Sequence, residues 1–131
     1  MRPLNTNNLE KIYYNKLVRD KIPQVIRKNG GDFKIKKLSN KELEKELIRK
    51  VGEEASGLLS AKNRSGLISE LADVLDVIEE IKRLKSITNQ EIKRAQIVAY
   101  DKKGGFKKKL YLFWSSDTGY KTNEKTVRRK R

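Results

Sequence analysis

Two consecutive segments with a helical spacing of apolar residues constrain this chain more than any other feature. The first follows Ser39, and the second lies at residues 67–81. The first carries Leu43, Leu47, Val51 and Leu58, and the second carries Leu67, Ile68, Leu71, Ala72, Val74, Leu75, Ile78 and Ile81. Apolar residues that recur every three or four positions fall on one side of an α-helix. The sequence NRSG at residues 63–66 breaks the pattern, so we expect two antiparallel, neighbouring helices.

Two capping boxes indicate where helices begin. In this motif a Ser or Thr and a Glu three residues later each accept a hydrogen bond from the other's backbone N–H. Ser39 with Glu42 opens the first apolar segment. Thr88 with Glu91 opens a further helix after the second segment. The segment at residues 67–81 is apolar on most sides, so we expect its helix to be the most buried one.

The expected fold is mainly α, a small helical bundle within residues 12–114. Residues 33–37 and 108–113 resemble short strands and could pair as a two-stranded β ribbon. Residues 1–11 are polar, and we expect them to be flexible. Residues 115–131 form a basic tail without a hydrophobic pattern, which we expect to be disordered. The chain is therefore expected to form one domain between two loose ends.

The residue types that are missing exclude several kinds of chemistry. The chain has no Cys and no His, which excludes disulfides, thiolate metal sites and catalysis by His. Any bound metal would need oxygen ligands, which favours Mg²⁺, Mn²⁺ or Ca²⁺. No apolar run approaches the roughly 18 residues of a membrane span, and the N-terminus lacks the hydrophobic stretch of a signal peptide. We expect a soluble, cytoplasmic protein that does not enter a membrane.

The net charge is +15, from 32 basic and 17 acidic residues. Such an excess favours polyanionic partners, such as nucleotides or nucleic acid. Part of the excess lies at residues 121–131, with six basic residues and one acidic residue. Lys enrichment that serves no partner is an equally good explanation. The charge alone therefore does not identify a ligand.

Acidic residues lie inside both apolar segments. Glu53 and Glu54 belong to the first segment, and a second pair, Glu70 and Asp73, belongs to the next. Residues three positions apart share one side of a helix, so the second pair points the same way. A buried carboxylate must be paired or must bind a cation. The two pairs could therefore converge on a divalent cation. Alternatively, the first pair is solvated and the second pairs with Lys or Arg.

These segments resemble a known family, the all-α nucleoside triphosphate pyrophosphohydrolases of the MazG-like group, which includes phosphoribosyl-ATP pyrophosphohydrolase. The family carries EExxE on one helix and ExxD on the next, where this chain has EEASG and ELAD. The sequences YNKLVRDKIPQVI and KKGGFKKKLYL are also similar to segments of short, single-domain members. The resemblance covers about Tyr13 to Phe113.

The resemblance implies an enzyme that hydrolyses a nucleoside triphosphate to the monophosphate and pyrophosphate. It implies Mg²⁺ as the cofactor, with Mn²⁺ as an alternative, and a homodimer or a dimer of dimers. The metal ligands that it implies are Glu54, Glu70 and Asp73. Glu53 and Glu54 form the catalytic pair of the first motif, in which Glu53 would support the site or position water.

Three basic residues in the sequence NKLVRDK are candidates for binding the substrate's phosphates: Lys16, Arg19 and Lys21. Arg offers paired N–H donors to a phosphate, and Lys offers a point charge. The alternative is a solvated, basic start to a helix.

The third Glu of the first motif would stand at position 57, where this chain has Gly57. The expected four carboxylates are therefore three. Mg²⁺ often uses one or two protein carboxylates together with water and substrate phosphates, so three could suffice. Alternatively, the protein is a catalytically impaired member of the family that binds nucleotide or nucleic acid. Asp76 lies one turn after Asp73 but points further round the helix, so we do not expect it to replace the missing ligand.

Aromatic residues lie among the basic residues near the C-terminal end: Tyr111, Phe113, Trp114 and Tyr120. Rings interleaved with cations can stack on bases while the cations neutralise phosphates. Nucleic-acid binding through the basic tail is therefore one interpretation. The favoured interpretation is a strand face formed by Leu110 and Leu112 beside a solvated tail.

Overall fold

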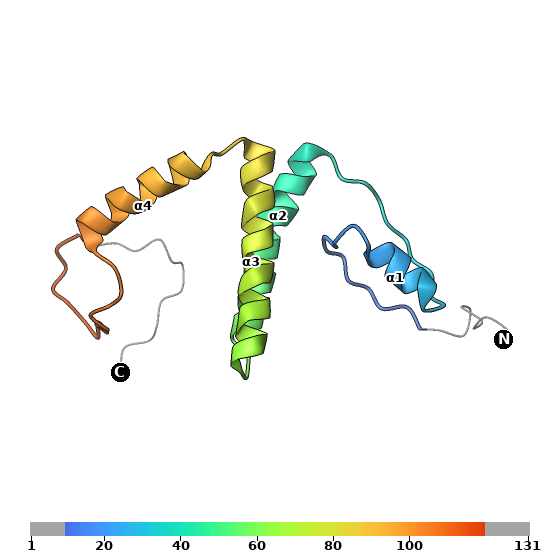
Figure 1. The fold of residues 1–131 in the computed structure, drawn as a ribbon, viewed down its shortest axis with the longest axis horizontal. Coiled ribbons are helices and arrows are strands. Elements are labelled where there is room, and N and C mark those ends of the chain that lie inside the picture. The colour runs from blue at the N-terminus through green and yellow to red at the C-terminus, as the bar shows by residue number, and fades with distance from the viewer. Residues whose placement is uncertain (1–9, 120–131) are drawn as a thin grey trace. The chain divides into compact units, whose positions relative to one another are not determined.

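A computed structural model of the chain describes residues 10–119 (Figure 1). These residues contain no β-strand and four α-helices: α1 (Ile22–Lys28), α2 (Asn40–Leu58), α3 (Arg64–Lys85) and α4 (Asn89–Lys103). The prediction of a mainly α-helical fold is confirmed. None of the helices in this part of the chain combines the length and the apolar character needed to cross a membrane. The predicted loose ends, residues 1–11 and 115–131, lie mostly outside the described residues and stay predictions.

The chain divides into two compact units, of which the first ends at Lys93 and the second begins at Arg94. Within the first unit, α2 and α3 pack side by side as an antiparallel hairpin (Figure 1). They are the only pair of helices in residues 10–119 that pack on each other. The expected antiparallel pair is therefore confirmed, and it is the framework on which the candidate site is built.

Side-chain caps fix where the helices begin. Ser39 Oγ accepts a hydrogen bond from the Glu42 N–H at 3.2 Å, and the Glu42 carboxylate accepts one from the Ser39 N–H at 3.1 Å. The Asn63 side chain caps α3 by accepting from the Gly66 N–H at 2.8 Å. The box at Thr88 opens α4 with bonds of 2.8 and 3.1 Å. These bonds satisfy N–H groups that have no partner in a first helical turn, and both predicted capping boxes are confirmed.

A narrow apolar seam joins α2 to α3. Leu47 and Val77 are the buried residues of the described chain, with 3% and 8% of their surface exposed. Val74, Ile81 and Leu84 extend the seam and are partly buried. The expectation that the second helix would be the most buried one was wrong, because a larger share of α2 than of α3 is buried or partly buried. Within residues 10–119, α3 packs only on α2, and one helix can cover only one side of another.

The seam separates two sides of the hairpin that differ in chemistry. Each residue of an α-helix turns about 100°, so residues two positions apart lie nearly opposite each other. On α3, Leu71 and Leu75 each stand two positions from Asp73. Ile78 stands two positions from Asp76. The carboxylates and these apolar side chains therefore leave the helix in opposite directions.

We call these two surfaces the carboxylate side and the apolar side. The carboxylate side, with the adjoining edge of the seam, comprises Lys50, Glu53, Glu54, Gly57, Glu70, Asp73 and Asp76. The apolar side comprises Ile48, Leu67, Ile68, Leu71, Leu75 and Ile78. Every residue of the apolar side is exposed, from 36% at Ile78 to 58% at Ile48 and Leu75. A contiguous exposed apolar patch on a protein surface is typical of an interaction site.

The predicted β ribbon is absent from residues 10–119. The expected strand at residues 108–113 is interrupted at Lys109, which has a left-handed backbone with a φ of 60°. The Lys109 N–H donates to the Phe106 carbonyl at 3.1 Å and closes a turn there. Ile35 and Leu110, one from each segment, are exposed. A two-stranded ribbon has little stability without a buried face, so the apolar residues of these short segments did not suffice to form strands.

Candidate metal and phosphate site

Three carboxylates converge on the carboxylate side of the hairpin. Glu54 comes from α2, whereas Glu70 and Asp73 come from α3, one turn apart. One oxygen of each lies within 4.8 Å of an oxygen of the other two, and all three residues are partly buried. The structure thus brings together the three residues to which the resemblance assigns the metal. A set of carboxylate oxygens is the kind of ligand that Mg²⁺ and Mn²⁺ prefer.

Gly57 faces this cluster from α2. A Cβ placed on Gly57 would collide with Oε2 of Glu70 and would lie 2.9 Å from its Cδ. Position 57 therefore points at the cluster, as the third Glu of the family motif would. The space that a side chain would fill is taken by the Glu70 carboxylate. Glycine here makes room for a compact cluster of three carboxylates.

Lys50 neutralises the two consecutive glutamates of α2. Its Nζ lies 3.2 Å from Glu53 Oε2 and 3.4 Å from Glu54 Oε1, and its side chain is only 14% exposed. Glu53 does not belong to the three converging carboxylates. Lys50 was not among the residues predicted from the sequence, although a Lys three and four residues from two acids on a helix has the spacing of helical ion pairs. That spacing could have identified it.

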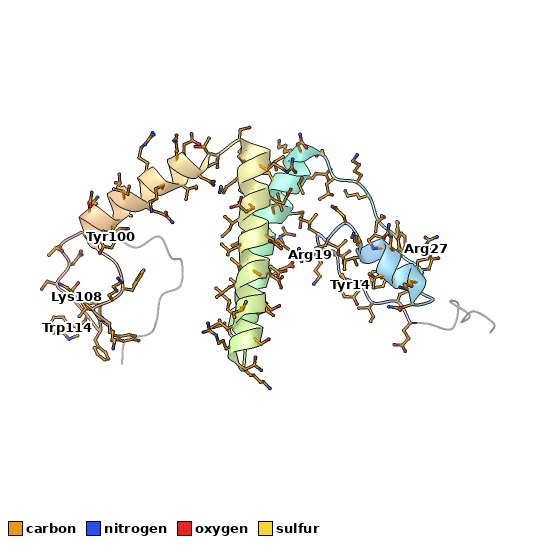
Figure 2. The ribbon with its side chains drawn as sticks, viewed as in Figure 1. Tyr14, Arg19, Arg27, Tyr100, Lys108 and Trp114 are labelled. Carbon is orange, nitrogen blue, oxygen red and sulfur yellow. The ribbon has the colours of Figure 1, made fainter. Side chains whose placement is uncertain are left out.

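Arg19 reaches the cluster from the segment before α1. Figure 2 labels Arg19 in this segment. Its Nη2 lies 3.1 Å from Asp73 Oδ1 and 2.9 Å from Asp76 Oδ2. The hydrogen bond to Asp76, reinforced by the charges of Asp76, Asp73 and Glu54, raises the pKa of the Arg19 guanidinium. The side chain therefore stays charged. Asp76 does not join the three converging carboxylates, as the sequence predicted, but its pairing with Arg19 was not foreseen.

The other two phosphate candidates lie apart from the carboxylates. Lys16 Nζ lies 5.7 Å from the centre of the Tyr14 ring. Lys21 is the N-cap residue of α1 and is exposed. Within the described residues, neither lysine makes an ion pair with the cluster. Of the three candidates in NKLVRDK, the structure brings Arg19 alone to the acidic residues.

In the second unit, the segment after α4 exposes aromatic rings beside lysines at residues 107–109 (Figure 2). Phe113 and Trp114 are 86% and 81% exposed. The rings of Tyr111 and Phe113 meet edge to face, with their centres 5.1 Å apart. Tyr120, the fourth aromatic residue of the predicted pattern, lies outside the described residues. The segment therefore combines accessible rings with positive charge.

No protein-family model, curated protein or solved structure matches the chain. The MazG-like resemblance therefore rests on the short motifs quoted above, from YNKLVRDKIPQVI to KKGGFKKKLYL. In the structure, acidic residues of EEASG and ELAD lie close together across two helices.

Proposed function

We propose that the protein is a MazG-like enzyme that hydrolyses a nucleoside triphosphate to the monophosphate and pyrophosphate with bound Mg²⁺ or Mn²⁺. The observation that carries the proposal is the convergence of three carboxylates from two helices with the charged Arg19 guanidinium at their edge. A divalent cation needs oxygen ligands, and a phosphate chain needs N–H donors. The hairpin and the segment before α1 supply both kinds of group at one place.

Glu54, Glu70 and Asp73 would hold the cation. Their oxygens lie within 4.8 Å of one another, where like charges repel unless a positive charge lies among them. When bound, Mg²⁺ neutralises charge on phosphate oxygens and lowers the pKa of a coordinated water. Three carboxylates are enough for this ion, because it retains waters and accepts substrate phosphates as ligands.

The remaining residues would bind substrate and handle the proton. Arg19 would donate to a phosphate oxygen, and Lys16 and Lys21 would add positive charge to the same segment. The attacking water bonds to the α-phosphorus, the bond from that phosphorus to the bridging oxygen breaks, and pyrophosphate leaves. No His is present, so the water's proton would pass to a carboxylate. Glu53, beside the cluster but not part of it, is the carboxylate that we assign to this role.

The proposed active form is a homodimer that forms through the apolar side. Exposed side chains such as Leu71 and Leu75 gain roughly 25 cal/mol for each Å² of apolar surface that is buried. A two-fold contact pairs the same patch on both copies, so a second hairpin offers a matching apolar side. Two hairpins would complete a four-helix bundle and leave both carboxylate sides accessible.

Nucleic-acid binding by the segment after α4 is a second candidate function. The exposed rings of Phe113 and Trp114 beside residues 107–109 favour it, because bases stack on rings and cations neutralise phosphates. Trp114 is the only Trp of the chain, so its fluorescence reports on this segment. Oligothymidylate should quench that fluorescence at low salt, and the fluorescence should recover at high salt, where the complex dissociates. Unchanged fluorescence would contradict this second function.

Pyrophosphate release from a panel of canonical and damaged nucleoside triphosphates tests the hydrolase proposal. The wild type should release pyrophosphate with Mg²⁺ and not with EDTA, and Asp73→Ala should lower the rate by on the order of 100-fold. Glu80→Gln is the matched control, because Glu80 lies on the same helix but pairs with Arg83 at 2.7 Å. An inactive wild type refutes the hydrolysis, and full activity in Asp73→Ala refutes the metal assignment.

A further inference from the structure

Arg19 makes its shortest contact with each of two acidic residues through the same nitrogen. Nη2 makes both contacts, at 3.1 Å to Asp73 and 2.9 Å to Asp76. A guanidinium carries five N–H donors on three nitrogens, and the fork is planar and rigid. Within residues 10–119, Nη1 and Nε donate no hydrogen bond. Their donors are therefore available to an incoming anion.

The two aspartates that hold Arg19 differ in their other neighbours. Asp73 belongs to the cluster with Glu54 and Glu70, whereas Asp76 stands outside it. A divalent cation on Asp73 competes with Arg19 for the same carboxylate and repels the guanidinium. Asp76 keeps its contact with Arg19, because it is not one of the three converging carboxylates. Cation binding should therefore loosen the Asp73 contact and retain the Asp76 contact.

Arg19 also connects its own segment to the hairpin. In the described part of the chain, its contacts with Asp73 and Asp76 are the only hydrogen bonds and ion pairs between residues 10–31 and α2 or α3. Helix α1 does not pack on either helix. Once a cation occupies Asp73, the position of Arg19 therefore depends on Asp76.

We propose that Asp76 is a positioning residue: it holds the Arg19 guanidinium beside the metal-binding carboxylates and directs Nη1 and Nε toward a phosphate oxygen of the substrate. This inference rests on the proposed function for the identity of the substrate. Asp76 itself touches neither the cation nor the phosphate. Its effect on the enzyme should therefore pass entirely through Arg19.

Kinetics of Asp76→Ala, Arg19→Ala and the double variant test this dependence. Asp76→Ala should raise the KM for the Mg²⁺–nucleotide about three- to fivefold, as expected for an exposed ion pair. Arg19→Ala should raise it by about tenfold or more, because a direct contact with phosphate is lost. The double variant should match Arg19→Ala alone, since the two residues act as one unit. Asp76→Glu should recover part of the loss, and Glu80→Gln should leave the KM unchanged.

Binding of inorganic triphosphate to the Mn²⁺-loaded protein separates this inference from the hydrolysis. Calorimetry should show about three- to fivefold weaker triphosphate binding in Asp76→Ala, with Mn²⁺ affinity within about twofold of the wild type. If the same loss appears in a protein that hydrolyses no nucleotide, the positioning role stands and only the proposed reaction fails.

Four results would overturn the positioning role. The first is a wild type that binds no triphosphate, and the second is an Asp76→Ala variant that binds it as the wild type does. The third is additive effects of Asp76→Ala and Arg19→Ala in the double variant. The fourth is a loss of Mn²⁺ affinity in Asp76→Ala as large as that in Asp73→Ala, because Asp76 would then be a metal ligand.

Discussion

The two sides of the α2–α3 hairpin differ in whether their side chains find partners within one chain. On the carboxylate side, Lys50 and Arg19 neutralise acidic residues at distances of 2.9–3.4 Å. On the apolar side, large side chains such as Ile48 and Leu75 remain exposed. Charges need only one or two partners each, whereas an apolar helix face needs a covering surface. The charged groups of the hairpin are thus paired within the chain, whereas its apolar side is left exposed to solvent.

Leu71→Glu should break the apolar side and produce the largest effect. In a dimer this substitution buries a charge twice, so the dissociation constant should rise by on the order of 100-fold. Glu is a good helix former and Leu71 is already exposed in the hairpin, so the helix content should not change. Sedimentation equilibrium gives the association state, and circular dichroism gives the helix content. A wild type that stays monomeric at every concentration would show that the apolar side does not join two copies.

Lys50→Met tests whether Lys50 competes with a cation on the carboxylate side. Met keeps the apolar stem of the side chain and removes the charge that pairs with Glu53 and Glu54. Mn²⁺ should bind several-fold more tightly, because it no longer competes with an ammonium group. The melting temperature in EDTA should fall, because two acids lose their counter-ion.

Lys82→Met is the control for Lys50→Met. The Lys82 side chain is as buried as that of Lys50, at 13% exposed. Both Lys82 and its partner Glu79, 2.9 Å away, lie on α3. Lys82 also donates to Asn89 at the start of α4. Its loss should lower the melting temperature without changing Mn²⁺ affinity. Equal Mn²⁺ affinities in the two variants would mean that Lys50 does not compete with a cation.

Gly57→Ala should have the smallest effect and should change stability and cation binding in opposite directions. Ala gains about 0.5–1 kcal/mol over Gly inside a helix. Its Cβ would displace the Glu70 carboxylate, so Mn²⁺ affinity should fall a few-fold while the melting temperature rises. Gly52→Ala is the control, because a Cβ there meets nothing within 4 Å. It should stabilise α2 equally and leave Mn²⁺ binding unchanged, and matching affinities in both variants would contradict the role given to Gly57.

The helices and the acidic cluster could be predicted because their determinants are local. The capping box at Ser39 and Glu42 involves residues three positions apart, and the structure reproduces it. Glu70 and Asp73 share a helical side by spacing alone. The structure has the break between the helices at residues 59–63 rather than at the predicted 63–66. A connection this short favours antiparallel packing of the two amphipathic helices, which brings Glu54 close to the other two carboxylates.

The features that could not be predicted depend on contacts between distant parts of the chain. The pairing of Arg19 with Asp76 joins segments that are far apart in the sequence, and no local pattern specifies it. The burial of α3 was overestimated because an apolar pattern does not show whether the surface that packs on the helix belongs to the same chain. Strand pairing at residues 33–37 and 108–113 would also have required a distant partner, and a turn at Lys109 interrupts the second segment.

A Mn²⁺ titration followed by electron paramagnetic resonance is the most direct test of a cation site between α2 and α3. Wild type and Glu80→Gln should each bind one Mn²⁺ per chain, and Mg²⁺ should displace it. Asp73→Asn should weaken that binding by about tenfold or more, because one of three converging anions is lost. Saturable binding that is the same in wild type and Asp73→Asn, or no saturable binding in the wild type, would contradict a metal site formed by Glu54, Glu70 and Asp73.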